Sequence, residues 1–195
     1  MKIAAKIESD RLVVDVEVTN ELDEPLYLKH WNLDWYGLLG IPEMDANKNP
    51  QTAFWTRELA YVCMGSASEV VLFNGKGPGP PPGIDVFAPR WPQSTRLPPK
   101  QTFHGTLRLP LPLREWHAHA APRSTHVKPA AATQLRYRLE TLCESHCREL
   151  PVKEAPSAPG LYRANGHPVQ ILEASVPLPA PITVLQRTDH FERFA

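Results

Sequence analysis

The sequence predicts an all-β protein, a single antiparallel β-sandwich domain that spans residues 1–195. Short stretches alternate apolar and polar residues, which is the period of a half-buried strand. Gly, Pro, Asn and Asp cluster between these stretches, as they do in turns. The 22 prolines are roughly twice the usual share of about 5%, and proline interrupts helices and central strands.

The first elements are expected to be three strands. The clearest is DRLVVDVEVTN, whose alternation predicts a half-buried antiparallel strand. Its apolar face consists of Leu12, Val14, Val16 and Val18. The preceding IAAKIE is expected to pair with it around ESD, and LYLKHW resumes as a strand after a turn.

A hairpin and a long loop follow. RELAYVCM and SEVVLF are strand candidates on either side of GSAS, so Ser66 is assigned to a hairpin turn rather than to a nucleophile motif. Residues 74–83, NGKGPGPPPG, predict an exposed connecting loop, because clustered Gly and Pro do not form the interior of a helix or sheet. This loop lacks the Gly-Lys-Ser/Thr order of a phosphate-binding loop.

The stretch FHGTLRLPLPLREWHAH changes character at its centre. From Phe103 to Leu109 the alternation is unbroken, which predicts a strand in a sheet. Pro110 and Pro112 have no backbone N–H to donate. Beyond Leu109 the segment therefore has to be an edge strand or leave the sheet.

The remainder of the chain predicts further strands with irregular segments between them. The strand candidates are QLRYRLET, HPVQILEASV and APITVLQRT. HAAPRSTHVKPAAAT is expected to be a loop, and the LCESHC segment has room for one helical turn. Residues 151–160 predict a Pro/Ala-rich linker.

Charge and composition exclude several classes of protein. Lys+Arg and Asp+Glu both number 21, which argues against a general nucleic-acid binder with its basic patch and high pI. The N-terminus MKIAAKIESD lacks the apolar core of a secretory signal, and no run approaches the roughly 18 apolar residues of a membrane span. Three cysteines do not make a disulfide framework. A cytoplasmic protein with reduced thiols is expected.

Two segments resemble a known family. LVVDVEVTNELDEPLYL, a strand, an Asn/Asp turn and a second strand, is similar to the opening of bacterial immunoglobulin-like domains, including bacterial intracellular proteinase inhibitors. RLPPKQTFHGTLRL resembles the turn that starts a strand in many such domains, although Lys100 stands where their pattern usually has Gly. The resemblance implies an immunoglobulin-like sandwich with long Pro-rich loops, a scaffold used more often for partner binding than for catalysis.

Histidines and cysteines supply a candidate metal site. His117 and His119 lie two residues apart, so in an extended segment both imidazoles face the same way. Cys143, His146 and Cys147 fall on one face if their segment is helical. Thiolate and imidazole ligands suit zinc, but neither group has a standard zinc-finger spacing. Zinc is therefore the alternative to a protein without a cofactor.

Three tryptophans are candidate binding residues: Trp35, Trp91 and Trp116. Tryptophan is enriched at binding hot spots, although packing in a core is the alternative explanation. The leading functional hypothesis is a non-enzymatic protein-binding module, such as an inhibitor or an immunity-type protein, that binds a protein partner and neither nucleic acid nor membrane. The alternatives are a zinc-binding protein or metalloenzyme, and a carbohydrate-binding module.

Overall fold

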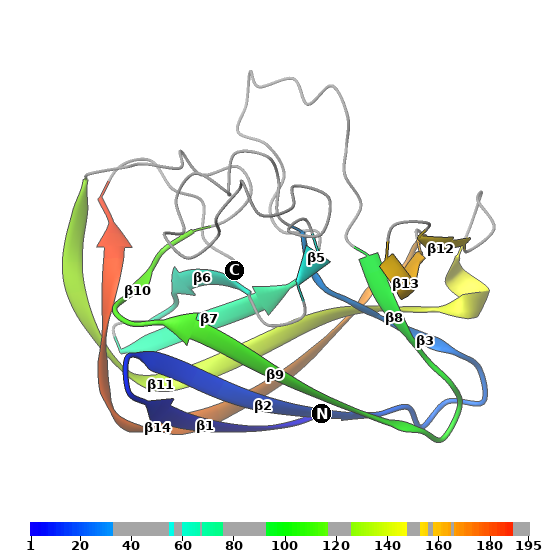
Figure 1. Ribbon diagram of the computed structural model, residues 1–195, viewed down its shortest axis with the longest axis horizontal. Helices are drawn as coiled ribbons and strands as arrows, with labels where there is room; N and C mark the ends of the chain where they lie inside the picture. Colours follow the sequence, from blue (N-terminus) through cyan, green and yellow to red (C-terminus); the bar gives the residue numbers. More distant parts are fainter. Residues whose placement is uncertain are drawn as a thin grey trace.

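The computed structural model describes residues 1–32, 55–56, 60–66, 68–75, 93–116, 126–147, 153–155, 158–164 and 166–188 (Figure 1). Within these ranges the fold is all-β, and the helical structure consists of one 3-10 turn, η2, at Glu144–His146. Helices long and apolar enough to cross a membrane do not occur in these ranges. The prediction of an all-β fold is confirmed.

The described strands form two main sheets and a short ribbon. In chain order they are β1 Lys2–Glu8, β2 Arg11–Thr19, β3 Leu26–Lys29, β4 Trp31–Asn32, β5 Trp55–Thr56, β6 Tyr61–Met64, β7 Glu69–Asn74, β8 Gln93–Leu97, β9 Thr102–Pro110, β10 Leu113–Arg114, β11 Val127–Cys143, β12 Lys153–Ala155, β13 Ala158–Arg163 and β14 Gln170–Arg187. Sheet A has the order β1-β2-β9. Sheet B has the order β10-β14-β11-β3-β8-β13-β12, with β7 also paired to β11 and β6 to β7. Among the described strands, β4 and β5 pair with each other and with no other strand.

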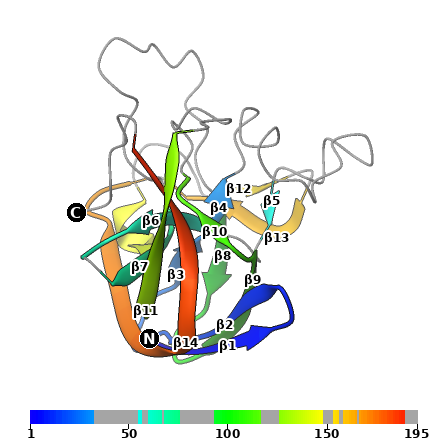
Figure 2. The same ribbon diagram turned by 90° about the vertical axis from the view of Figure 1, so that its left-hand side faces the viewer.

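Sheet A lies across the long strands β11 and β14 of sheet B, whose strong curvature is visible in Figure 2. One core fills the space between the sheets. Leu12, Val14 and Leu107 contribute to it from sheet A, and Leu72 and Leu135 from sheet B. Part of the outward side of sheet B is buried as well: at β6 and β7, Tyr61 and Phe73 are at most 5% exposed. The outward side of sheet A, in contrast, is polar and largely exposed.

The N-terminal hairpin forms as the alternation predicts. β1 and β2 pair antiparallel around a turn at Ser9, whose φ of 53° lies in the left-handed region used by tight turns. The predicted apolar face of β2 is buried throughout: Leu12, Val14, Val16 and Val18. The hairpin of β6 and β7 also matches its prediction, with Ser66 in the turn between them.

The proline-rich stretch after β9 leaves its sheet, as its sequence indicates. β9 pairs with β2 up to Pro110 and is the last strand of sheet A. After Pro112 the chain continues as β10, which pairs with β14 in sheet B. The missing N–H groups of the two prolines therefore fall at the crossing between the sheets.

Two predictions about the second half are wrong. Residues 127–133, expected in a loop, form the first part of β11. The two predicted final strands are one strand, β14, which is paired to β11 on both sides of a register shift between Ala132 and Gln134. Pro179 and Pro181 fall between the paired positions Pro177 and Ile182, where an N–H is not needed by β11.

The predicted linker at 151–160 contains β12 and the start of β13, which pair with each other. β12 is the terminal strand of the sheet order, a position where prolines are tolerated.

The pairing in sheet B is not purely antiparallel, because β7 runs parallel to β11 and β10 runs parallel to β14. Of the predicted loop at 74–83, Asn74 ends β7, Gly75 follows it, and the rest lies outside the described residues.

Candidate functional site

The predicted site residues are only partly within the described ranges. Trp35, Trp91, His117 and His119 lie outside them. Trp116 is half-buried, and its backbone exchanges two hydrogen bonds with Val62, with N···O distances of 3.0 and 2.8 Å. Its ring lies 5.4 Å from that of Tyr61 and packs on Cys63 and Val71.

The cysteines of the predicted metal set lie in different apolar clusters. Cys143 ends β11 in the core between the sheets, whereas Cys147 packs beside Tyr27 on the opposite side of sheet B. The thiol of Cys147 donates a hydrogen bond to the carbonyl of Cys143 at 3.5 Å, and burial raises the pKa of both thiols. Among the described residues, no three His, Cys, Asp or Glu side chains gather where they could hold a metal ion.

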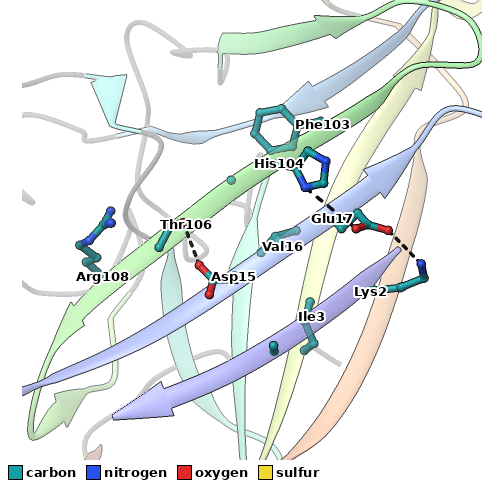
Figure 3. A pocket seen from close by; sticks show the side chains of 11 residues that line it. Lys2, Ile3, Asp15, Val16, Glu17, Phe103, His104, Thr106 and Arg108 are labelled. Atoms are coloured by element: carbon teal, nitrogen blue, oxygen red, sulfur yellow. Dashed lines mark hydrogen bonds and ion pairs between the residues drawn. The ribbon is translucent and has the colours of Figure 1, made fainter. Parts of the chain in front are cut away.

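The outward face of sheet A carries a depression of about 720 Å³, shown in Figure 3. Its walls are cross-strand rows of polar side chains. In one row, Glu17 lies between Lys2 and His104: its carboxylate is 2.9 Å from the Lys2 ammonium and 4.0 Å from the His104 ring. The Lys2 ammonium lowers the pKa of Glu17 through a hydrogen bond and its charge.

The next row also lines the depression. Ala4, Asp15 and Thr106 are paired across the three strands, and the Thr106 hydroxyl donates to the Asp15 carboxylate at 2.9 Å. Charges of both signs alternate on this face, so its field is balanced rather than strongly acidic or basic. Such a face is open and carries charged side chains, unlike the enclosed pockets that bind small molecules.

Among the described strands β9 pairs with β2 alone, so its other edge, next to this face, has no partner strand there. Two hydrogen bonds just beyond the ends of β9 show which of its residues bond to β2. The Leu111 N–H donates to the Asp10 carbonyl at 2.7 Å, and the Asn20 N–H donates to the Gln101 carbonyl at 2.9 Å. Hydrogen-bonded pairs alternate in an antiparallel ladder. The odd-numbered residues of β9 therefore bond to β2. The even-numbered residues, Thr102, His104, Thr106 and Arg108, direct their N–H and C=O groups away from β2.

Phe103 shapes this edge. Figure 3 shows its ring on the side of β9 that faces away from β2. A Cβ atom at Gly105 would lie 2.7 Å from the ring, so only glycine permits Phe103 to fold over the strand there. Behind the edge lies a cavity of about 20 Å³ lined by Phe103, Gly105, Thr106 and His30 among others.

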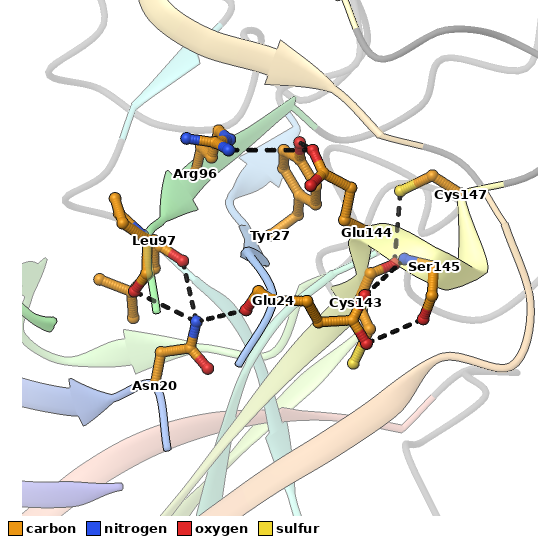
Figure 4. Close-up of polar contacts among 10 residues, drawn as sticks. Asn20, Glu24, Tyr27, Arg96, Leu97, Cys143, Glu144, Ser145 and Cys147 are labelled. Atoms are coloured by element: carbon orange, nitrogen blue, oxygen red, sulfur yellow. Dashed lines mark hydrogen bonds and ion pairs between the residues drawn. The ribbon is translucent and has the colours of Figure 1, made fainter. Parts of the chain in front are cut away.

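A corner held by Asn20 positions the start of β9 (Figure 4). Two neighbouring connections pass between the sheets at this corner: β2 of sheet A continues into β3 of sheet B, and β8 of sheet B continues into β9 of sheet A. The Asn20 amide donates to the carbonyls of Glu24, Leu97 and Pro98 at 2.9–3.2 Å. Since Asn20 is 1% exposed, these bonds are shielded from water and fix the angle between the β2–β9 pair and the β3–β8 pair.

The same corner is joined to the end of β11. The Glu24 carboxylate accepts hydrogen bonds from the Ser145 N–H at 2.7 Å and from its hydroxyl at 2.8 Å (Figure 4). The N–H bond is the larger cause of a lowered Glu24 pKa. Nearby, the Tyr27 hydroxyl donates to Glu144 at 2.8 Å, and burial is the main reason that the pKa of Tyr27 is raised to about 12.

Sequence reasoning did not single out the outward face of sheet A as a site. The signal was present, because Thr102, His104, Thr106 and Arg108 share one parity in FHGTLRLPLPLREWHAH. What the sequence could not provide is the pairing of β9 with a strand some ninety residues away, which creates the rows and leaves one edge free. Comparisons of the chain with protein-family models, with curated proteins and with solved structures gave no match.

Proposed function

We propose that the chain is a non-enzymatic protein-binding module built on an immunoglobulin-like β-sandwich, in the manner of an inhibitor or immunity-type protein. The observation that supports this proposal is the outward face of sheet A. It combines a broad, shallow depression of about 720 Å³ with exposed charges of both signs and with a free strand edge. A partner protein with a complementary shape covers such a face better than a small molecule does, because the depression is open to solvent.

The rigidity of the face also suits recognition. Each of its side chains stands on a strand whose opposite side is packed in the core, as at Val14 and Val16. Paired side chains such as Lys2 with Glu17 and Thr106 with Asp15 are therefore presented in fixed rows. Fixed, charge-complementary rows give specificity and fast association rather than great affinity.

Capture of partners from the native cell extract tests the proposal. The immobilised protein is expected to retain a stoichiometric protein partner, and the double variant Asp15→Lys, Glu17→Lys is expected to lose it. Asp23→Lys is the control for reversal of an acidic charge, because Asp23 is an exposed acid in the turn before β3 that pairs with Lys100, away from this face. Absence of a stoichiometric partner, or equal capture by the double variant, would contradict the proposal.

A further inference from the structure

The free edge of β9 identifies the kind of partner segment that sheet A accepts. We propose that β9 binds an extended, acidic strand of a partner protein, which adds to sheet A as a fourth strand. This inference rests on the proposed function, because it takes the partner to be a protein, and it specifies the chemistry of the segment that is recognised. Strand addition of this kind derives its affinity from backbone hydrogen bonds and its specificity from alternate side chains.

The backbone of β9 is available for such pairing. The N–H and C=O groups of Thr102, His104 and Thr106 point away from β2, and among the described strands β9 pairs with β2 alone. The side chain of His104 is 73% exposed, so the outward face beside this edge is open to solvent at its centre. Three consecutive outward positions span a strand of about five residues, the length of an average strand.

The strand β2 shows which sequence complements β9. It places Glu17 opposite His104, Asp15 opposite Thr106 and Thr19 opposite Thr102. Its valines lie between these positions and face the core. A strand added at the free edge meets the same side chains of β9 from the other side. The best complement therefore has acids or hydroxyls on the outward face and small branched apolar residues on the inward face, beside Phe103 and the cavity behind it.

Charge distinguishes a partner strand from a second copy of this chain. Two β9 edges in antiparallel pairing would bring His104 and threonines opposite one another, and neither edge has an acid at Thr102, His104 or Thr106 to offer the other. An acidic partner strand offers the His104 ring a carboxylate, as Glu17 of β2 does, whereas a second copy does not. The edge therefore favours a different protein with an acidic strand over self-association.

The experiment uses a synthetic peptide with the sequence of residues 13–19, VVDVEVT, and hydrogen exchange of the full-length protein followed by NMR. Without peptide, the amides of Thr102, His104 and Thr106 are expected to exchange fast and those of Phe103 and Gly105 slowly. With peptide, the first three amides become protected. A control peptide in which lysine replaces both acids is expected to bind about tenfold more weakly.

The variant Thr106→Pro tests the edge itself, because it removes an outward N–H without removing any bond to β2. It is expected to weaken peptide binding by about tenfold. Thr106→Val is the matched control: both variants lose the hydroxyl and its bond to Asp15, but the valine keeps the N–H, so the valine variant should bind about tenfold more tightly than the proline variant. If Thr106→Pro does not fold, as judged by loss of protection at Phe103, the pair Thr102→Pro and Thr102→Val replaces it.

Three results would overturn the proposal: slow exchange of the outward amides in the free protein, peptide that leaves their exchange unchanged, or equal binding by the proline and valine variants. Equal binding by the two variants would also indicate that the peptide displaces β2. A peptide in the place of β2 would bond to the odd-numbered amides of β9 and would not need the N–H of residue 106. Failure of this proposal is distinguishable from failure of the proposed function. If Thr106→Pro captures a cellular partner as well as the wild type does, the protein binds that partner through another surface and the strand-addition proposal is wrong. If the peptide binds but the cell extract yields no partner, the edge of β9 accepts a strand and the proposed function is wrong.

Discussion

Lys29 and Glu140 form an ion pair across β3 and β11 in which the side chains are only 2% and 8% exposed. Gly75, with a φ of +156°, allows the Glu140 side chain to approach the end of β7, since a Cβ there would lie 2.6 Å from its carboxylate. Removal of one partner leaves a buried charge without its counterion. We expect Lys29→Met to lower the free energy of unfolding by about 3–5 kcal/mol in urea titrations.

The double variant Lys29→Met, Glu140→Met completes a double-mutant cycle. The cycle separates the interaction energy of the ion pair from the cost of burying each charge. It should recover most of the stability, because well-packed apolar replacements of buried pairs are often neutral. Lys6→Met is the control, since Lys6 pairs with Glu8 at the surface and its loss should leave the urea midpoint unchanged. A loss in Lys29→Met no larger than in Lys6→Met would show that the buried pair does not stabilise the fold.

Asn20→Ala removes an amide that satisfies three backbone carbonyls at the corner between the sheets. At about 1 kcal/mol for each hydrogen bond, a loss of about 2–4 kcal/mol is expected. Asn20→Asp should be at least as unstable at neutral pH, because a carboxylate then faces three carbonyl oxygens, and it should regain stability in acid as that carboxylate is protonated. Thermal unfolding at pH 7 and pH 4 measures both. Equal stability of the alanine variant and the wild type would show that the Asn20 hydrogen bonds do not stabilise the corner.

Lys100 has a φ of 60°, the left-handed region that side chains other than Gly and Asn rarely adopt. Its ammonium offsets this strain by donating to the Glu21 carbonyl at 2.7 Å and pairing with Asp23. Lys100→Ala loses these contacts and keeps the strain, whereas Lys100→Gly loses the contacts and relieves it. The glycine variant should therefore be more stable than the alanine variant by about 1 kcal/mol in urea titrations. The reverse order would mean that the turn does not need a left-handed residue.

The lowered pKa of Glu24 predicts a pH dependence. A carboxyl whose pKa is lower in the folded than in the unfolded chain stabilises the fold above the unfolded value, near 4.5, and this contribution is lost as pH falls through the folded pKa. NMR titration of the Glu24 carboxyl should give a midpoint below 4.5. Ser145→Ala should raise that midpoint only in part, because the backbone N–H remains. A midpoint unaffected by the substitution would exclude the hydroxyl as a cause.

The thiols should react slowly, because burial raises the pKa of Cys143 and Cys147 and the thiolate is the reactive form. With a disulfide reagent at pH 8, Cys147 is expected to react before Cys143, which is 3% exposed. Elemental analysis tests the zinc alternative at the same time. Bound zinc at one equivalent, or a lower melting temperature with a chelator, would contradict a protein without a cofactor.

Local patterns predicted the parts of the fold that depend on neighbouring residues. The face of β2 and the turn at Ser9 follow from alternation and turn chemistry, and the exit of the chain from sheet A follows from Pro110 and Pro112. β14 could not be predicted as one strand, because three prolines usually end a strand. Here a four-residue bulge opposite β11 places Pro179 and Pro181 where no ladder bond is required.

The candidate site was less predictable than the fold. The rows on sheet A join residues from β1, β2 and β9, so they exist only once the register between distant strands is set. The metal hypothesis treated the segment of Cys143 and Cys147 as one helical face. The structure instead ends β11 at Cys143 and inserts a 3-10 turn, which directs the two thiols to opposite sides of sheet B.

The long interval between β2 and β9 also matters while the chain is being made. The hairpin of β1 and β2 leaves the ribosome with Leu12, Val14, Val16 and Val18 ready on one face. Its partner β9 is completed only at Pro110, on the order of 10 s later at ordinary rates of synthesis. During that interval the nascent chain carries an uncovered apolar strand with one unpaired edge, a surface that chaperones recognise and that other nascent chains can join.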